Sequence, residues 1–303
     1  DYFARFTQRW PTVQALAAAS EDDVMKEWAG LGYYSRACNL KKCADRIVAE
    51  YNGAFPADVE KLRALPGIGD YTAAAIASIA FDIPSPVVDG NVERVFTRLF
   101  AIDTPLPKAK AEIKARVSEV LADDRPGDFA QACMDLGATI CTPRKPACLH
   151  CPLRMSCTVL GVQDPELFPV KPPKKEKPNR RGAAFVIIND RDELLLEKRP
   201  STGLLANMAQ VPTTDWNSRK NGAVDAESAP MPNLEWRRVG EIDHVFTHFS
   251  LTLTVWKTQI LKSQYEPKQN QWWSRIETLD EQALPTVMKK AIARALPGAK
   301  NEG

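Results

Sequence analysis

Four of the seven cysteines in this 303-residue chain fall in one run, CTPRKPACLHCPLRMSC. They are Cys141, Cys148, Cys151 and Cys157, with six, two and five residues between them. Four thiolates so close together can surround one metal centre, either tetrahedral zinc or an iron–sulfur cluster. Zinc ribbons use two Cys-x2-Cys knuckles, whereas this run has one, and its uneven spacing suits a larger group. The spacing therefore favours a [4Fe–4S] cluster over zinc.

The residues around these cysteines indicate what the cluster does. His150 lies within the run, but four thiolates already complete a ligand set, so we interpret it as a bystander. The basic residues Arg144, Lys145 and Arg154 fit a loop that contacts phosphates. We therefore expect the cluster to stiffen this loop rather than to transfer electrons.

A second stretch, LPGIGDYTAAAIASIAF, places Leu65, Gly67 and Gly69 directly before a helix of small residues. Two glycines permit a tight turn whose backbone N–H groups point outward beside a helix N-terminus, and such a turn can bind a phosphate. An ordinary helix–helix turn has the same pattern. This stretch alone leaves both interpretations open.

A third stretch, SPVVDGNVERV, sets Asp89 between an apolar run and a glycine. An aspartate before Gly-Asn is a good helix N-cap. A carboxylate held by hydrogen bonds on such a turn, next to Asn91, can also stabilise positive charge in a reaction. The residues are compatible with both roles.

The elements that carry these residues are helical up to about residue 160. Ser20 and Asp23 predict a capped helix start. Short helices between Gly and Pro residues are predicted at 70–81, 89–101, 107–121 and 127–139. Helical spacing predicts that the remaining cysteines are buried thiols: Cys38, Cys43 and Cys133.

The pattern changes after a stretch rich in Pro and Lys at 161–180, which is typical of a semi-extended linker. Beyond it, GAAFVIIND, ELLLEKRP and HFSLTLTVWKTQI have the pattern of strands, and LPTVMKKAIARAL that of a final helix. The predicted fold is multidomain. It has an all-α domain at 1–160, a linker at 161–180 and an α+β domain at 181–303.

Composition limits the class of protein. With 44% hydrophobic residues the chain can bury two cores, and it lacks both an apolar window of about 18 residues and a signal-like start, so we expect a soluble intracellular protein. The net charge of +2 does not by itself indicate a nucleic-acid partner. The basic run 171–181 is compatible with a basic face and equally with a solvated linker. The opening DYFARFTQRWPTV is similar to the middle of an amphipathic helix, so we expect upstream sequence to be missing.

Taken in this order, the LPGIG turn, VVDGNVERV and the cysteine run resemble the helix–hairpin–helix DNA glycosylase superfamily. The details are similar to the MutY-type adenine DNA glycosylases, including GLGYYSRACNL, FAQACMDLGATIC and a C-terminal half like that family's Nudix-like domain. The resemblance implies base excision repair, by hydrolysis of the N-glycosidic bond of adenine opposite 8-oxoguanine or guanine in double-stranded DNA. It also implies a [4Fe–4S] cofactor, DNA contacts from Leu65, Gly67 and Gly69, and a cytoplasmic, nucleoid-associated monomer with no membrane partner.

The endonuclease III branch shares these motifs but carries a lysine two residues after the second glycine, where it forms a Schiff base with the sugar. Here that residue is Tyr71. Without this amine a lyase step lacks its nucleophile, which indicates a monofunctional glycosylase. The resemblance implies a catalytic site of Asp89, Asn91 and Tyr71, in which Tyr71 helps to hold Asp89. Core packing is the other interpretation of Tyr71.

Removal of a purine requires a proton on the base and negative charge near the sugar cation. The resemblance gives the second role to Asp89. It places the proton donor in a glutamate of a motif similar to SEVMLQQT, which this chain lacks. We expect this segment to precede Asp1 and the chain alone to be severely impaired.

Recognition of a flipped base needs a wedge and a pocket. Tyr33 of GLGYY matches the family's intercalating tyrosine, with Leu31 beside it, whereas Tyr34 is predicted to lie in the core. Gln131 falls where the family places a side chain near the flipped adenine.

The C-terminal half lacks the glutamate series with which Nudix hydrolases bind Mg²⁺, so we predict recognition rather than hydrolysis. Phe246, Thr247 and His248 stand where the family commonly has Phe-Ser-His, the loop that contacts 8-oxoguanine. Threonine keeps the hydroxyl and adds a methyl group. An alternating strand with outward polar residues explains part of this pattern.

Three other functions stay open at this point. They are a non-catalytic DNA-binding module with a structural cluster, an endonuclease III-like glycosylase and lyase, and a metabolite hydrolase centred on the C-terminal half. The absent glutamate series disfavours the hydrolase, and Tyr71 disfavours the lyase.

Overall fold

The computed structural model describes residues 2–173 and 176–297, so parts of the predicted linker and of the last domain lie outside the described residues. The chain forms two compact units, one of residues 46–175 and one of residues 1–45 together with 176–303. This division by contacts differs from the predicted one in two respects. The predicted linker 161–180 is divided between the two units at residue 175. Residues 1–45 group with the C-terminal half instead of with 46–160, because their apolar side chains pack there.

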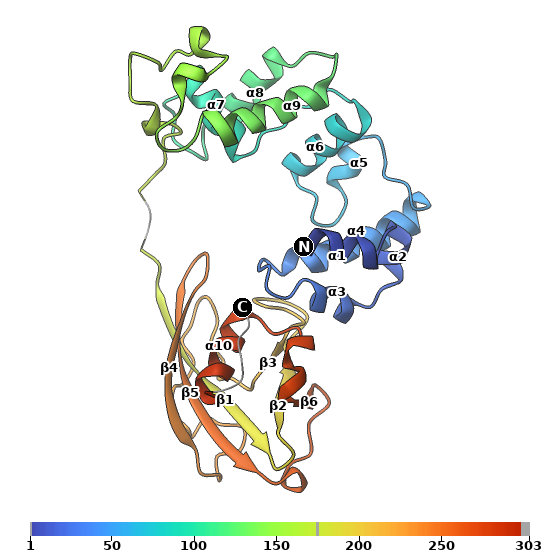
Figure 1. Ribbon diagram of the computed structural model, residues 1–303, viewed down its shortest axis with the longest axis vertical. Coiled ribbons are helices and arrows are strands. Elements are labelled where there is room, and N and C mark those ends of the chain that lie inside the picture. Colours follow the sequence, from blue (N-terminus) through green and yellow to red (C-terminus); the bar gives the residue numbers. More distant parts are fainter. Residues whose placement is uncertain (1, 174–175, 298–303) are drawn as a thin grey trace. The chain divides into compact units, whose positions relative to one another are not determined.

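The unit of residues 46–175 is helical (Figure 1). The long helix α4 (Ser35–Tyr51) ends in it. Its other helices are α5 (Val59–Arg63), α6 (Asp70–Phe81), α7 (Gly90–Leu99), α8 (Lys110–Val120) and α9 (Pro126–Asp135). A π-helical turn, Leu136–Ile140, continues α9, and the cysteine run follows with short 3₁₀ helices. This order confirms the helices predicted between residues 70 and 139.

Local sequence explains where these helices begin. Asp58 caps α5 by accepting a hydrogen bond from the backbone N–H of Lys61 at 2.8 Å. Pro126 occupies the first turn of α9, where a missing N–H costs nothing. Among the described residues, the larger apolar core of these helices is made chiefly of Val92, Val95, Phe96, Ile102, Ile113 and Val117, and a smaller one contains Ala74, Val87 and Ala130.

The other unit begins with α1 (Tyr2–Arg9), α2 (Val13–Ala18) and α3 (Glu21–Glu27). The Ser20 hydroxyl accepts from the backbone N–H of Asp23 at 3.1 Å, which confirms the predicted cap of α3. The buried side chains of this segment share a core with residues far along the chain: Leu16, Val24, Met25, Tyr34, Ala37, Ala44, Met208 and Ala283. This shared core is the physical reason why residues 1–45 belong to this unit.

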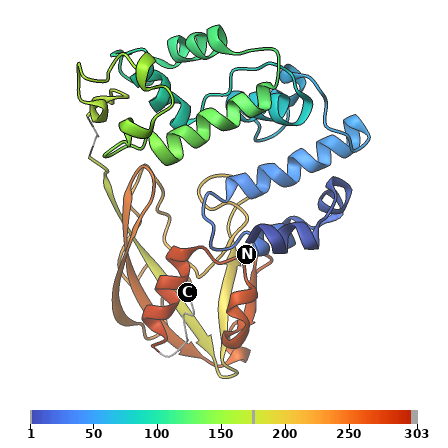
Figure 2. The same ribbon diagram turned by 45° about the horizontal axis from the view of Figure 1, so that its top comes forward.

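The rest of the unit is a mixed sheet with a C-terminal helix (Figure 2). Its elements are β1 (Asn179–Asn189), β2 (Glu193–Lys198), β3 (Ala209–Gln210), β4 (Arg237–Val245), β5 (Ser250–Ile260), β6 (Gln271–Arg275) and α10 (Thr286–Ala295). The strand order is β3-β2-β1-β5-β4, with β6 beside β2. Only the β1–β5 pair is parallel among the described pairs of strands. The predicted α+β fold is confirmed.

The core of this sheet explains its long apolar runs. β1 is buried on both faces from residue 182 to residue 189, as expected for a central strand. α10 covers one face of the sheet with its buried residues Val287, Met288, Ala291 and Ile292. In a separate buried cluster, Trp236 packs against Phe185. Within the described ranges the structure has no helix of the length and apolar character that a membrane crossing requires.

Candidate active site and cysteine pocket

Asp89 is the N-cap of α7, as one of its two predicted roles requires. Its Oδ1 atom accepts hydrogen bonds from the backbone N–H groups of Asn91 at 2.9 Å and Val92 at 2.7 Å. Its Oδ2 atom accepts from Nδ2 of Asn91 at 3.0 Å. The carboxylate is half-buried. Three donors thus fix its orientation, while Oδ2 receives only one of them and keeps a lone pair for another group.

The side chain of Asn91 connects this carboxylate to the protein interior. Its Oδ1 atom accepts from Nη2 of Arg94 at 2.9 Å. The same guanidinium donates to the carbonyl oxygens of Gly137 at 2.5 Å and Cys141 at 2.7 Å. A continuous chain of hydrogen bonds therefore runs from Asp89 to the backbone of the first cysteine of the run.

Arg94 is 9% exposed, which is unusual for a charged side chain. Burial lowers the pKa of its guanidinium, whereas the charges of Cys141 and Asp89 act in the opposite direction. Its hydrogen bonds to carbonyl oxygens compensate for the loss of water. Sequence reasoning missed this residue, although it lies in the VVDGNVERV stretch.

Gly137 makes the close approach behind Asp89 possible. A Cβ atom at this position would lie 2.6 Å from Cβ of Asn91 and 3.0 Å from its carbonyl oxygen. A larger residue would therefore push the π-helical turn away from α7. Sequence reasoning also missed this residue, since a glycine near the end of a helix is more often a C-cap.

The glycine turn between α5 and α6 has the predicted geometry. Gly67 adopts a φ of 76°, and Gly69 is the N-cap of α6 with no side-chain cap. Within the described chain, no acceptor is present for the backbone N–H groups of Gly69, Asp70 and Tyr71. The side chain of Leu65 is 3% exposed, so it packs in the interior behind the turn. It is therefore not available for a contact with DNA.

Tyr71 does not hold Asp89 by a hydrogen bond. Its hydroxyl donates to the sulfur of Met134 at 3.7 Å, and its side chain is 44% exposed. Gln131 is exposed, and its Nε2 donates to the carbonyl oxygen of Gly127 in its own helix at 3.2 Å. Both side chains are therefore accessible to solvent, and within the described chain neither forms a hydrogen bond with the aspartate.

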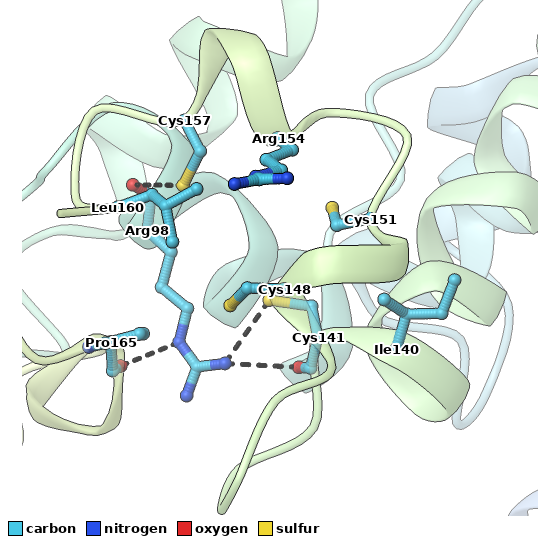
Figure 3. Close-up of a pocket in the computed structure, with 9 residues that line it drawn as sticks. All are labelled: Arg98, Ile140, Cys141, Cys148, Cys151, Arg154, Cys157, Leu160 and Pro165. Atoms are coloured by element: carbon cyan, nitrogen blue, oxygen red, sulfur yellow. Dashed lines mark hydrogen bonds between the residues drawn. The ribbon is translucent and has the colours of Figure 1, made fainter.

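The four cysteines of the run line one pocket (Figure 3). The cavity that they line is small, with a volume of about 30 Å³. The other lining residues are Arg98, Ile140, Arg154, Leu160 and Pro165. His150 is exposed and does not line it, in agreement with its interpretation as a bystander.

Arg98 fastens this loop to α7 and is 2% exposed. Its Nη1 atom donates to Sγ of Cys141 at 3.3 Å and to the carbonyl oxygen of Thr142 at 2.8 Å. Its Nε atom donates to the carbonyl oxygen of Pro165 at 2.7 Å. The thiol of Cys157 donates to the carbonyl oxygen of Arg98 at 3.6 Å. One buried arginine thus joins both ends of the cysteine run.

The four thiols of this pocket lie close enough for their charges to interact. In the described part of the chain, no three His, Cys, Asp or Glu side chains converge on one metal position, yet the four cysteines face one pocket. Burial and the charges of the three other cysteines raise the pKa of the Cys148 thiol. A multi-iron cluster bound by thiolates would offset this mutual repulsion.

The predicted buried thiols are confirmed in part. Cys43 is buried, whereas Cys38 and Cys133 are half-buried. Burial raises the pKa of Cys133 to about 11 and also raises the pKa of the other two. All three are therefore protonated and poor metal ligands near neutral pH.

The GLGYY segment presents one aromatic ring and buries the next. Tyr33 is 69% exposed and Leu31 is 44% exposed, whereas Tyr34 is 8% exposed, as predicted. Tyr33 has a φ of 47° and follows Gly32 with a φ of 70°. A tyrosine in the left-handed region costs energy, and such strain concentrates at functional loops.

The Phe246–His248 loop joins β4 to β5, and its three residues differ in exposure. Thr247 and His248 are exposed, whereas Phe246 is half-buried against the core of the sheet. The Phe246 ring stacks on Phe249 with 4.6 Å between centroids. Phe246 is therefore an anchor of the loop, and only its two neighbours are presented to solvent.

Comparison with known proteins identifies the family. Residues 1–122 match the HhH-GPD superfamily of base excision DNA repair proteins, and residues 183–294 match a NUDIX domain. The adenine DNA glycosylase of Rattus norvegicus is 35% identical over 96% of this chain and 67% of its own length. That of Homo sapiens is 34% identical over 96% of this chain and 64% of its own length. The chain belongs to the adenine DNA glycosylase family.

This membership confirms the resemblance and makes the chain a DNA glycosylase of base excision repair. The chain spans about two thirds of the length of these relatives. Among solved structures, a thermostable thymine-DNA glycosylase is 26% identical, with a TM-score of 0.48 over 52% of this chain and 73% of that one.

The structure brings some of the predicted residues together and separates others. Asp89 and Asn91 are in contact and are linked through Arg94 to Cys141. The glycine turn and the cysteine pocket lie in the same unit as this chain of contacts. The residues predicted to read the mispair belong to the other unit: Leu31, Tyr33, Phe246, Thr247 and His248.

Proposed function

We propose that the protein hydrolyses the N-glycosidic bond of adenine opposite 8-oxoguanine or guanine in duplex DNA, without a lyase step. The observation that carries this proposal is the carboxylate of Asp89, which three hydrogen bonds fix at the start of α7. It belongs to a chain of the adenine DNA glycosylase family. The family supports adenine as the base that is released, and the geometry supports Asp89 as the residue that serves the chemistry.

The chemistry assigns Asp89 one role. As the bond between adenine and the sugar breaks, the base takes up a proton and positive charge develops at the sugar. A carboxylate oxygen with a free lone pair, oriented by Asn91, stabilises that charge electrostatically. Water then adds to the sugar and leaves an abasic site.

The absence of a lyase step rests on position 71. A tyrosine stands there, and its hydroxyl contacts Met134. A phenol cannot form a Schiff base with the sugar, which requires an amine. The products are therefore free adenine and an intact abasic strand.

The cysteine pocket is the proposed site of a [4Fe–4S] cluster. Cys141, Cys148, Cys151 and Cys157 would hold it, and this assignment is supported by the uneven spacing of the run and by the pocket that all four cysteines line. When bound, the cluster would join four points of the loop covalently to one rigid group. The chain's own residue Arg98 keeps this loop on α7 in either case.

The remaining predicted residues would bind the duplex. The unpaired N–H groups at the start of α6 suit a DNA phosphate. Tyr33, with Leu31 beside it, would enter the stack, and Gln131 would face the flipped adenine. Thr247 and His248 would contact 8-oxoguanine, since they are the exposed residues of their loop.

A single-turnover assay with Asp89→Asn tests this proposal. Asparagine keeps an oxygen for the backbone N–H groups of Asn91 and Val92, so α7 stays capped. We expect adenine release from an A:8-oxoguanine duplex to fall by a factor of about 100 or more while duplex binding persists. Asp58→Asn is the matched control, because Asp58 is also an N-cap, that of α5, and its carboxylate is exposed.

Two results would overturn the proposal. An unchanged rate in Asp89→Asn would remove the aspartate from the chemistry. Tight duplex binding without any adenine release by the full-length wild-type protein would favour the non-catalytic DNA-binding module instead.

A further inference from the structure

The loop between β4 and β5 is a short hairpin turn whose two ends are held by strand pairing. Val245 pairs with Ser250 in the sheet, and the backbone N–H of Phe246 donates to the carbonyl oxygen of Phe249 at 2.8 Å. Only Thr247 and His248 lie beyond this last hydrogen bond. The direction in which they point therefore depends on how the peptide units around Phe246 are held.

A stack of rings holds the side chain of Phe246. Its ring lies parallel to Phe249 at 4.6 Å and meets the edge of His244 at 4.6 Å. Trp216 lies 6.4 Å away on the core side, and the guanidinium of Arg199 stands 5.4 Å from the Trp216 ring. Such contacts fix the position of the Phe246 ring within the sheet's core. They do not by themselves fix the peptide unit that follows Phe246.

A lysine outside the hairpin holds that peptide unit. The ammonium group of Lys177 donates to the carbonyl oxygen of Phe246 at 2.9 Å. The two residues that follow Lys177 also contact the hairpin. The backbone N–H of Ser250 donates to the carbonyl oxygen of Pro178 at 3.1 Å, and its hydroxyl donates to Oδ1 of Asn179 at 3.2 Å. Residues 177–179 thus form a clamp across both ends of the turn.

The hydrogen bond from Lys177 to Phe246 also affects the orientation of the next backbone N–H group, because the peptide unit is planar. The carbonyl group of Phe246 and the N–H group of Thr247 belong to one planar unit and point in opposite directions. A donor on the carbonyl oxygen therefore also orients the N–H of Thr247. That N–H has no acceptor within the described part of the chain, so it is available to a ligand.

We propose that Lys177 is a positioning residue that sets the specificity for 8-oxoguanine by orienting Thr247 and His248. This inference rests on the proposed function, in which these two residues read the base opposite adenine. 8-oxoguanine carries a carbonyl oxygen at C8 that guanine lacks, and an oriented N–H donor favours such an acceptor. Lys177, which belongs to the basic run 171–181, thus has a defined structural partner.

The test replaces Lys177 by methionine, which keeps the length of the side chain and removes the donor. We expect the affinity of the full-length protein for an A:8-oxoguanine duplex to fall by about 5- to 10-fold, as for loss of one charge-assisted hydrogen bond. The affinity for an A:G duplex and the single-turnover rate at saturating enzyme should change less than about twofold. Lys177→Arg should restore the selectivity, because it restores a donor.

Lys220→Met is the matched control. Lys220 is another exposed lysine of this unit, and its ammonium group pairs with Asp215 rather than with the loop. It reports what loss of one positive charge does to DNA binding in general. An equal loss for both duplexes in Lys177→Met, similar to that in Lys220→Met, would overturn the positioning role. So would unchanged selectivity.

The same assay separates failure of this inference from failure of the proposed function. If the wild-type protein prefers A:8-oxoguanine but Lys177→Met does too, only the role of Lys177 is wrong. If the wild-type protein shows no preference and releases no adenine, the proposed function falls, and the role of Lys177 falls with it.

Discussion

The protein holds Asp89 and the Thr247–His248 tip in two different ways. Asp89 is the outer end of a chain of hydrogen bonds that continues inward to Arg94, which is 9% exposed. Before the tip of the hairpin, the carbonyl group of Phe246 is held from the surface by the exposed Lys177, whereas the ring of Phe246 packs on the buried Phe249. Buried polar contacts are costly to break, whereas surface contacts are adjusted at little cost. We infer that the proposed chemistry is fixed rigidly and that recognition is tuned separately.

Loss of Arg94 should have the largest effect. Arg94→Met leaves the buried carbonyl oxygens of Gly137 and Cys141 without their donor, so we expect the free energy of unfolding to fall by about 3 kcal/mol or more. Urea unfolding measures this. Arg116→Met is the control, because Arg116 pairs with Glu119 on the surface of α8 and its loss should cost less than about 1 kcal/mol. Equal stability of the two variants would show that Arg94 does not hold the interior together.

A methyl group at Gly137 should have the next largest effect. Its Cβ would lie 2.6 Å from Cβ of Asn91, so Gly137→Ala must displace Asn91 or the π-helical turn, at a cost of about 1–3 kcal/mol. Single-turnover kinetics should also show slower adenine release, because Asn91 orients Asp89. Gly90→Ala is the control for thermal stability, since a Cβ there meets nothing within 4 Å. A Gly137→Ala variant as stable and as active as the wild type would contradict the close packing.

Replacing Tyr33 should separate stability from function. Tyr33 adopts a φ of 47° with 69% of its surface exposed, so Tyr33→Gly relieves strain, loses little packing and should stabilise the protein by about 0.5–1 kcal/mol. Activity on duplex DNA should nevertheless fall. Asp82→Gly is matched, because Asp82 also has a left-handed φ, of 52°, at the end of α6. It should stabilise the protein to a similar extent without loss of activity, and the same loss in both variants would argue against a wedge.

The smallest expected effect concerns pH and the ring stack. Burial, and to a lesser degree the charge of Lys290, lower the pKa of His244 from its ordinary value of 6.5. The folded state therefore binds this proton less readily than the unfolded state, so the free energy of unfolding should fall as the pH drops below about 6.5. The expected change is below about 1 kcal/mol. His244→Phe should reduce this slope, as measured by urea unfolding at a series of pH values.

The sequence predicts the local features of the fold well. The cap at Ser20, the helices around Asp89 and the strand pattern after residue 181 are set by neighbours in the chain, and the structure has them. The cysteine run also predicts its pocket, because four residues of one loop cannot lie far apart. Such features depend on short-range geometry that the order of residues specifies.

What the sequence does not predict depends on contacts between distant segments. Arg94 and Arg98 look like solvated charges on a helix, and only the approach of residues 136–165 explains why both are buried. Leu65 looks like part of a DNA-binding turn, but its side chain is buried. Residues 1–45 group with the C-terminal half through Met208 and Ala283, which no local pattern indicates.

The central claim is that Asp89 and its partners serve the cleavage step and leave the choice of mispair to the other unit. The most direct measurement is the single-turnover rate of Asn91→Ala in the full-length protein, on A:8-oxoguanine and A:G duplexes at saturating enzyme. This change removes the donor to Oδ2 of Asp89 and keeps both backbone donors to Oδ1. We expect the rate to fall by about tenfold, and by the same factor on both duplexes. An unchanged rate, or a loss confined to one duplex, would contradict the claim.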